Sequence, residues 1–242
     1  MAGLTALQDI TLQANAHYIA GSDEELGTAT LMAKACSAGL ALQPLGGTQG
    51  GPCGTSSLVT LNLTNGTRQE IRNGPAGVWS GPDGTPHAMA QHNTLVPATW
   101  FYPALVLAEA LNDPSVQLAY VGQEAKGGVA VAHLQFWRVV PSVASGTSSD
   151  LAMKLFAHLT SVDVYLAAAS SLPVALDFNL HPDNNAGLDI PVEIQYSNYQ
   201  KMSGMLLPAH VQKLMNNSLL LDLSITGAAI NSGIPSSDFN IQ

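Results

Sequence analysis

Strict alternation of apolar and polar residues is the feature of this sequence that most limits its fold. Val59, Leu61 and Leu63 alternate with polar residues, and Asn65-Gly66 follows directly. A period of two places successive side chains on opposite faces of a β-strand, so the stretch predicts a half-buried strand. Asn-Gly is a strong hairpin signal, so a second, antiparallel strand is expected to follow.

The length of this first turn decides which side chains share a face. A two-residue Asn-Gly loop would place Arg72, Glu70 and Arg68 opposite the three apolar residues. A three-residue loop, with Gly66 in the left-handed conformation, would instead place Ile71 opposite Val59. Because a slip of one residue exchanges the two faces, the apolar pattern favours the three-residue loop.

The same scheme continues through most of the chain. Gly81-Pro82-Asp83-Gly84 predicts a turn between a strand ending near Trp79 and one beginning at His87. Turns recur at the spacing that is typical of β-sandwiches and barrels, which predicts antiparallel pairing rather than βαβ units. Further strands are expected at residues 116–122, 129–140, 162–166, 172–180, 191–199, 206–216 and 219–229.

Two segments have the pattern of helices. Residues 103–111 are apolar, begin with Pro103 at a position that suits a first helical turn, and end before Asn112-Asp113-Pro114. Residues 149–160 carry Leu151, Leu155 and Leu159 at a spacing of four, which predicts one apolar stripe. The polar connector before this second helix is the one plausible domain boundary. Similar strands lie on both sides of it, so residues 1–242 are expected to form a single domain.

Composition restricts the partners and the compartment. Eight Lys and Arg against seventeen Asp and Glu give a net charge of −9, which excludes the basic patch that nucleic acid requires. No stretch approaches the roughly 18 apolar residues of a transmembrane helix, and the first residues lack the pattern of a signal peptide. Low charge and abundant small polar residues are nevertheless typical of exported proteins. We therefore expect a periplasmic or secreted protein whose signal peptide is absent from this chain.

The two cysteines, Cys36 and Cys53, are separated by a glycine-rich loop. An even number of cysteines in an exported chain favours a disulfide between them, although two unrelated buried thiols remain the alternative. Closing a loop of about 15 residues would stabilise the fold by about 3 kcal/mol in the chain-entropy model.

A search for catalytic and metal-binding motifs finds none. The chain has no Gly-x-Ser-x-Gly, no phosphate-binding glycine loop and no His-Glu-x-x-His. His87 and His92 could serve as metal ligands or as an acid–base pair, but two histidines five residues apart are a weak signal, and a position on a strand face and one in a loop are the favoured explanation. Residues 181–185 (HPDNN) lack the ordered acidic spacing of a calcium loop and predict a turn. We therefore expect no catalytic residue, no metal ion and no cofactor.

Aromatic residues suggest where an apolar ligand could bind. Trp100, Phe101 and Tyr102 are consecutive and lead into the predicted helix at 103–111, while Trp79 and Met89 belong to the hairpin just before. These five side chains are predicted to line an apolar pocket under that helix. The alternative is that they form ordinary core.

Several segments resemble known proteins. Residues 162–166 (VDVYL), 181–185 (HPDNN) and 190–199 (IPVEIQYSNY) resemble a group of secreted proteins from soil acidobacteria, and so do residues 77–79 and 98–103. More distantly, the ending with Tyr199, Gly204 and Pro208 followed by two strands resembles the LolA/LolB superfamily of outer-membrane lipoprotein-sorting proteins. The resemblance to the acidobacterial group covers most of the chain from about Leu58 onward.

The LolA-like resemblance implies a mainly β fold: one curved antiparallel sheet, or half-open barrel, with short helices that cover its concave face. It also implies binding of a lipid or acyl chain in an apolar hollow without covalent chemistry. No ligand-contacting residue of that superfamily can be matched here position by position. We therefore expect a non-enzymatic envelope protein that binds an apolar small molecule or lipid. A secreted hydrolase that uses the His87/His92 region, or a scaffold with no small-molecule site, are the alternatives.

Overall fold

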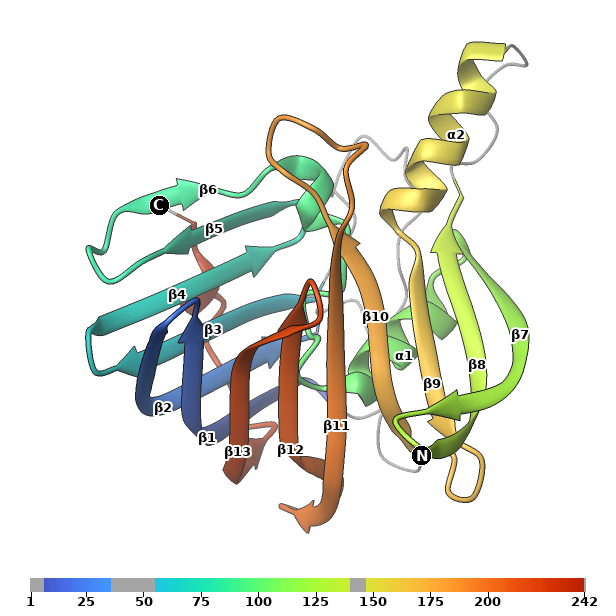
Figure 1. Cartoon of the computed structure of the whole chain (residues 1–242). Helices are drawn as coiled ribbons and strands as arrows, with labels where there is room; N and C mark the ends of the chain where they lie inside the picture. The colour runs from blue at the N-terminus through green and yellow to red at the C-terminus, as the bar shows by residue number, and fades with distance from the viewer. Residues whose placement is uncertain (1–6, 36–54, 140–146, 242) are drawn as a thin grey trace.

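Thirteen β-strands form one continuous antiparallel sheet (Figure 1). The computed structural model describes residues 7–35, 55–139 and 147–241. The strands are β1 (Asp9–Ala20), β2 (Asp23–Lys34), β3 (Ser56–Leu63), β4 (Gly66–Asn73), β5 (Ala76–Ser80), β6 (Pro86–Ala88), β7 (Val116–Lys126), β8 (Val129–Arg138), β9 (Val162–Ala167), β10 (Pro173–Leu180), β11 (Ile190–Met202), β12 (Met205–Met215) and β13 (Ser218–Ile230). The expected strands from residue 58 onward are confirmed, whereas β1 and β2 were not predicted.

The order of strands in the sheet is β6-β5-β4-β3-β2-β1-β13-β12-β11-β10-β9-β8-β7. Every neighbouring pair is therefore consecutive in the chain except β1 and β13, which meet in the middle of the sheet. The two edges are β6 and β7, and the chain passes from one edge to the other through residues 89–115.

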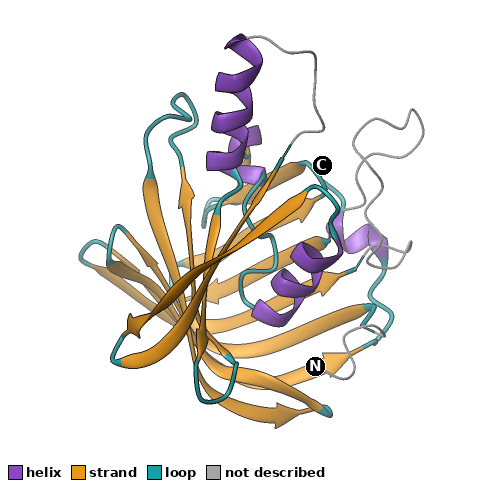
Figure 2. Cartoon of the chain, turned by 90° about the vertical axis from the view of Figure 1, so that its right-hand side faces the viewer, coloured by secondary structure: helices purple, strands orange, loops and turns teal. Residues whose placement is uncertain are grey.

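The sheet is strongly curved and does not close into a barrel, and its concave face holds the core (Figure 2). Buried apolar side chains of that face come from both halves of the sheet, among them Leu12, Leu31, Ile194 and Leu223. This arrangement confirms the expected half-open antiparallel sheet.

Helix α1 (Pro103–Asn112) lies in the concavity (Figure 2). Pro103 occupies its first turn, where a missing backbone N–H costs nothing, and Leu105, Val106 and Leu107 are buried against the sheet. Burying each of these side chains stabilises the fold by about 1.5–3 kcal/mol. The crossover from β6 to β7 therefore supplies the packing that an open sheet would otherwise lack.

A carboxylate joins β1 to the segment after β13. Asp9 is buried and accepts hydrogen bonds from the backbone N–H groups of Ser232, Gly233 and Ile234, at 2.7, 3.0 and 3.3 Å. The Ser232 hydroxyl donates to the same carboxylate at 3.0 Å. Several backbone donors on one buried carboxylate satisfy its charge and fix the path of the chain beyond β13.

The predicted register of the first hairpin is wrong. Strand β3 ends at Leu63 and β4 begins at Gly66, so the loop has two residues and Val59 pairs with Glu70. This register turns Arg68, Glu70 and Arg72 toward the concave face, together with Val59 and Leu61. The apolar pattern misled the prediction because these inward-facing charges have partners inside the fold, described below.

Helix α2 (Thr147–Leu159) is confirmed as an element, but it does not cover the concave face. It projects beyond the end of the sheet near β8 and β9 (Figure 1). Leu151 is 70% exposed and Leu155 is 45% exposed, and of the predicted stripe only Leu159 is buried.

The predicted disulfide and the expected lack of a transmembrane helix stand differently against the structure. Cys36 and Cys53 both lie outside the described residues, so their disulfide stays a prediction. Within the described residues, no helix combines the length and the hydropathy that a bilayer crossing would need.

Candidate functional site

The aromatic segment before α1 lies at the centre of the concave face. Trp100, Phe101 and Tyr102 are 4%, 0% and 1% exposed, and the first two rings meet edge to face with centroids 5.7 Å apart. The Tyr196 hydroxyl on β11 donates a hydrogen bond to the Trp100 carbonyl. The structure therefore brings three of the five predicted site residues together in the core.

The other two predicted site residues lie on the β5–β6 hairpin and its end. Trp79 is 45% exposed and stacks on His87, with ring centroids 4.4 Å apart. Met89 is half-buried, and its backbone N–H donates to the Gly77 carbonyl at 2.8 Å. Whether any of the five contacts a ligand stays a prediction.

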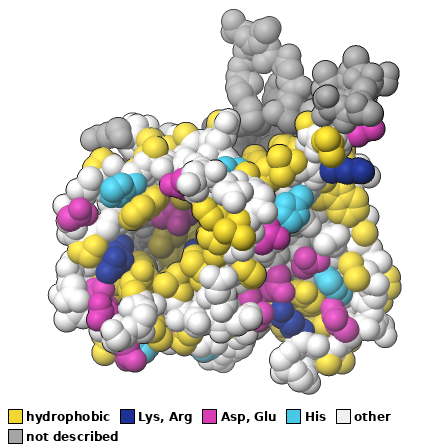
Figure 3. Space-filling view, turned by 45° about the horizontal axis from the view of Figure 1, so that its top comes forward, with side chains coloured by type: hydrophobic (Ala, Val, Ile, Leu, Met, Phe, Trp, Pro, Cys, Tyr) yellow, Lys and Arg dark blue, Asp and Glu magenta, His cyan; other side chains and the backbone are white. Residues whose placement is uncertain are grey.

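Beside the packed aromatic segment, the concave face is hollowed. Figure 3 shows the hollow walled mainly by hydrophobic side chains, with acidic and basic groups among them. Tyr18 and Met215 face the concave side and are only half-buried. They pack against the edge of the core but stay partly exposed, so the protein's own side chains cover this part of the inward face incompletely.

Lys213 on β12 points into the same region. It pairs with Ile194 and Leu221, both of the concave core, and its Nζ lies 4.8 Å from the centre of the Trp100 ring. Among the described residues no carboxylate lies within 4.0 Å of this ammonium group. Burial lowers the pKa of Lys213, and Arg72 lowers it further, whereas Glu70 opposes the shift.

Arg72 and Glu70 face Lys213 from β4, on the opposite side of the hollow. The Arg72 guanidinium is buried and donates to the carbonyls of Thr94 and Val96 at 2.6 and 3.1 Å. Its second terminal nitrogen lies 3.8 Å from Glu70. Two backbone acceptors and one carboxylate compensate the cost of burying this cation.

Arg68 and Glu25 form a second pair on the concave face. Arg68 donates to the buried Glu25 carboxylate at 2.5 Å, and its guanidinium lies 4.6 Å from the centre of the Tyr18 ring. The hydrogen bond from Arg68 lowers the pKa of Glu25, so this carboxylate is ionised at neutral pH. Arg68, Arg72 and Lys213 thus lie near Glu25 and Glu70, so basic side chains outnumber acidic ones here, in a chain of net charge −9.

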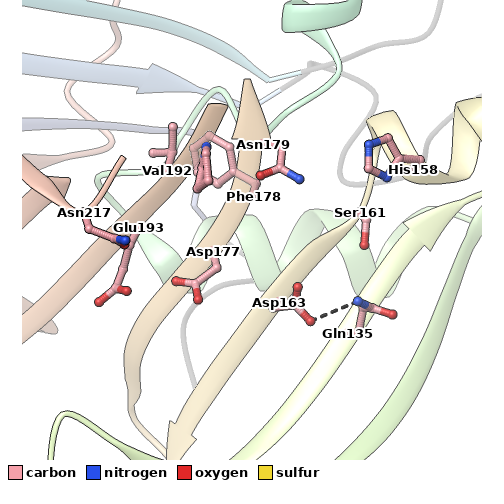
Figure 4. Close-up of a pocket in the computed structure, with 11 residues that line it drawn as sticks. Gln135, His158, Ser161, Asp163, Asp177, Phe178, Asn179, Val192, Glu193 and Asn217 are labelled. Atoms are coloured by element: carbon pink, nitrogen blue, oxygen red, sulfur yellow. Dashed lines mark hydrogen bonds between the residues drawn. The ribbon is translucent and has the colours of Figure 1, made fainter. Parts of the chain in front are cut away.

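A separate cleft lies on the outer face of the sheet (Figure 4). Its volume is about 290 Å³, and three carboxylates line it from adjacent strands: Asp163 on β9, Asp177 on β10 and Glu193 on β11. Lys126, at the end of β7, neutralises part of this charge by donating to Asp177 at 2.7 Å and to Glu193 at 2.9 Å.

The acidic cleft has the electrostatics of a structural ion-pair network. Burial raises the pKa of Asp177, an effect that Lys126 opposes. Burial lowers the pKa of Lys126, but its hydrogen bonds to Asp177 and Glu193 outweigh this effect and raise it. His133 bridges Glu124 and Asp163, at 2.7 and 2.8 Å. Within the described part of the chain, Asp177 Oδ1 is buried without a hydrogen-bond partner, but each of the three carboxylates has at least one cationic or histidine partner, so the cleft is less suited to a ligand than the hollow.

The histidine pair considered from the sequence does not form one site. His87 stacks on Trp79, whereas His92, in the 3₁₀ turn η2 (Gln91–Thr94), contacts the Pro182 carbonyl at 3.2 Å. Within the described residues no hydrogen bond or ring contact joins the two imidazoles.

These features define a class: an open, curved antiparallel sheet that holds one helix in its concavity beside an apolar hollow with a few internal charges. No family model matches the chain, and no curated protein matches it in sequence. Solved structures do share the fold, and they are LolA-like, as the sequence resemblance implied.

Three of these structures cover nearly the whole chain. A candidate outer-membrane lipoprotein-sorting domain from Vibrio parahaemolyticus has a TM-score of 0.54 at 12% identity, covering 99% of this chain and 91% of its own. A LolA superfamily protein from Nitrosomonas europaea has a TM-score of 0.54 at 10% identity, with coverages of 98% and 91%. A DUF1329 family protein from Desulfovibrio piger has a TM-score of 0.53 at 9% identity, with the same coverages. At such identities the likeness establishes the fold, and function requires a separate argument.

Sequence reasoning missed the charged residues of the hollow. Arg68, Glu70 and Arg72 alternate along β4, which is a visible period-two signal, but the misplaced register assigned them to the solvent face. Lys213 lies in a strand of mixed composition, and its inward orientation depends on the register of β12 with both neighbours.

Proposed function

We propose that this protein is a non-enzymatic carrier of the cell envelope that binds an amphiphile with an apolar chain and an anionic head. The chain of the ligand occupies the hollow on the concave face, and its head group lies near Lys213. The observation that carries this proposal is the ammonium group of Lys213, which has no carboxylate partner among the described residues and lies within an apolar, incompletely filled concavity.

The apolar part of the ligand follows from the wall of the hollow. A hydrocarbon chain that covers half-exposed side chains such as Tyr18 and Met215 gains about 25 cal/mol for each Å² removed from water. The LolA-like fold is compatible with this role, because the helix already occupies one part of the concavity and leaves the other part open.

The anionic head follows from the charge balance. Arg72 donates to two carbonyls and lies beside Glu70, and Arg68 is paired with Glu25, whereas among the described residues Lys213 has no carboxylate within 4.0 Å. In the same part of the chain each arginine also keeps one buried Nε–H without a partner, but Lys213 is the cation that no carboxylate neutralises. An ionised head group that accepts a hydrogen bond from Lys213 would gain about 1.5–3 kcal/mol. A fatty acid or an acidic lipid has this chemistry.

The test is binding of a fluorescent fatty acid and of its methyl ester to the wild-type protein and to Lys213→Met. Methionine keeps the length of the side chain and removes the charge. We expect the variant to bind the free acid about 10- to 100-fold more weakly, because that is the loss corresponding to one charge-assisted hydrogen bond. Binding of the uncharged ester should change little.

Lys154→Met, on the exposed part of α2, is the matched control and should bind both probes as the wild type does. Failure of the wild-type protein to bind either probe would refute the proposed function. Equal weakening of acid and ester in Lys213→Met would refute the assignment of the head group, while the apolar hollow would stand.

A further inference from the structure

Three histidines and one aspartate converge at the end of the sheet near α2, outside the hollow. His92 belongs to η2, His158 to the last turn of α2, His181 follows β10, and Asp189 precedes β11. The imidazole of His181 lies between the other two, with ring centroids 5.8 Å from His92 and 5.7 Å from His158.

Asp189 joins two of these imidazoles. Its Oδ1 lies 2.9 Å from His158 Nε2 and 3.5 Å from His181 Nδ1. One ligand atom from each of His158, His181 and Asp189 lies within 4.8 Å of the others. Atoms bound to one tetrahedral zinc ion lie about 3.3 Å apart. The nitrogen of His181 that faces Asp189 is Nδ1, so binding through Nε2 requires the side chains of His158 and Asp189 to rotate toward the other edge of the His181 ring.

The side chain of His181 supplies an independent sign that something is bound here. It is fully buried, and its Nδ1 lies 3.1 Å from the Leu188 carbonyl, which can only accept a hydrogen bond. The ring proton therefore resides on Nδ1, and Nε2 carries a lone pair. This Nε2 is buried without a hydrogen-bond partner among the described residues, an unfavourable arrangement that an ion or a donor would relieve.

The contact with the Leu188 carbonyl also fixes the tautomer that presents Nε2 to an ion. A hydrogen bond from one imidazole nitrogen to a backbone carbonyl is also the usual support of a metal-binding histidine.

We propose that His158, His181 and Asp189 bind a divalent transition-metal ion of the zinc type. Two imidazoles and one carboxylate form a ligand set that zinc accepts, and they leave a fourth position open for water or a small anion. His92 acts as a positioning residue, because its Nε2 donates to the Pro182 carbonyl and so holds the loop that carries His181.

The neighbouring cleft gives an ion a route from solvent. His158 lines this cleft (Figure 4). The side chain of His158 is 44% exposed, and that of Asp189 is 40% exposed. Sequence analysis predicted no metal site because the ligands come from separate segments, and their spacing of 23 and 8 residues follows no short motif.

The test is titration of the full-length chain, after dialysis against EDTA, with ZnCl₂ in a calorimeter. We expect one equivalent of zinc to bind, and we expect His181→Ala and Asp189→Asn to weaken binding by more than about 100-fold. Circular dichroism would establish that each variant is folded. His87→Ala, which changes a histidine stacked on Trp79 outside the cluster, should bind zinc as the wild type does.

Substitution with Co²⁺ provides a second measurement, since nitrogen and oxygen ligands in tetrahedral geometry give intense visible absorption. Absence of zinc and cobalt binding by the wild-type protein would overturn the proposal. Binding that persists unchanged in folded Asp189→Asn and in His158→Ala would overturn it as well, because the ion would then lie elsewhere. These outcomes do not depend on whether the hollow binds a lipid.

Discussion

Trp100 provides the most direct test of how the concave face is packed. Its side chain is 4% exposed between α1, β11 and β12, so Trp100→Ala removes one of the largest buried groups of the core. Truncating a buried tryptophan costs about 3–5 kcal/mol from lost transfer energy and the cavity left behind. Lys213 also loses the aromatic face that lies 4.8 Å from its Nζ, a contact that contributes about 0.5–2 kcal/mol.

One effect of Trp100→Ala increases the free energy of unfolding. The indole Nε1 of Trp100 is buried and has no hydrogen-bond partner among the described residues, so truncation also removes an unsatisfied donor worth about 1–3 kcal/mol. Taken at their central values, the three effects sum to a loss of about 3 kcal/mol in the free energy of unfolding. Trp79→Ala is the matched control, since a side chain that is 45% exposed should cost under about 1 kcal/mol.

The measurement is urea unfolding followed by far-ultraviolet circular dichroism, which does not depend on tryptophan fluorescence. We expect Trp100→Ala to lower the midpoint with little change in the slope, and Trp79→Ala to remain close to the wild type. If the two variants lost equal stability, or if Trp100→Ala cost under about 1 kcal/mol, Trp100 would not be packed as described. In that case the residue would be a pocket wall rather than core.

Two further predictions follow from single buried groups. Burial raises the pKa of Glu109 from 4.5 to about 8; Arg138 opposes this rise and Asp113 adds to it. Between these two pH values the carboxyl group is protonated in the folded protein and ionised in the unfolded chain. This contribution to stability is complete below pH 4.5 and is lost as the pH rises to about 8. The free energy of unfolding of the wild type should therefore fall over that range, by up to about 5 kcal/mol, and in Glu109→Gln it should depend less on pH. If the free energy of unfolding of both proteins changed with pH in the same way, the raised pKa of Glu109 would be contradicted. A Cβ added at Gly27 would lie 1.9 Å from the Asn62 carbonyl oxygen, so Gly27→Ala must displace β2 from β3. We expect the free energy of unfolding to fall by at least about 2 kcal/mol, which thermal unfolding would measure. Gly227→Ala in β13 meets no atom within 4 Å and is expected to be neutral, so similar melting temperatures for the two variants would count against the β2–β3 packing.

The fold was largely predictable because its dominant signal is local. Alternation and turn residues identified the strands from β3 onward, and Pro103 with the following apolar run identified α1. Strands β1 and β2 also alternate, as Ile10, Leu12 and Ala14 show, but they were not assigned. The resemblance to LolA-like proteins supplied the curvature of the sheet, which period-two alternation cannot reveal.

The charged part of the hollow was not predictable for a physical reason. Apolar residues were assumed to define the inward face of every strand, whereas β4 turns Arg68, Glu70 and Arg72 inward. Such an arrangement is stable only because Glu25, Thr94 and Val96 offer acceptors from distant parts of the chain. The sequence of one strand does not show which distant residues will contact it. Its pattern therefore cannot distinguish a charged side chain in solvent from one that is buried and paired.

The pairing of β1 with β13 has a consequence for how the chain folds. All other strand pairs join neighbours in sequence, so β1–β6 and β7–β13 can each form by loop closures much shorter than the one between β1 and β13. The contact between Ile10 and Ile230, by contrast, must close a loop that spans most of the chain. Because long closures lose more chain entropy than short ones, we expect two meanders to form first and to join along β1 and β13 as a late, rate-limiting step. The buried carboxylate of Asp9, which accepts its hydrogen bonds from residues beyond β13, can be satisfied only after that step. We therefore expect Asp9→Asn to fold at the wild-type rate but to unfold faster, because the substitution weakens the pairing of β1 with β13 and leaves the two meanders unchanged.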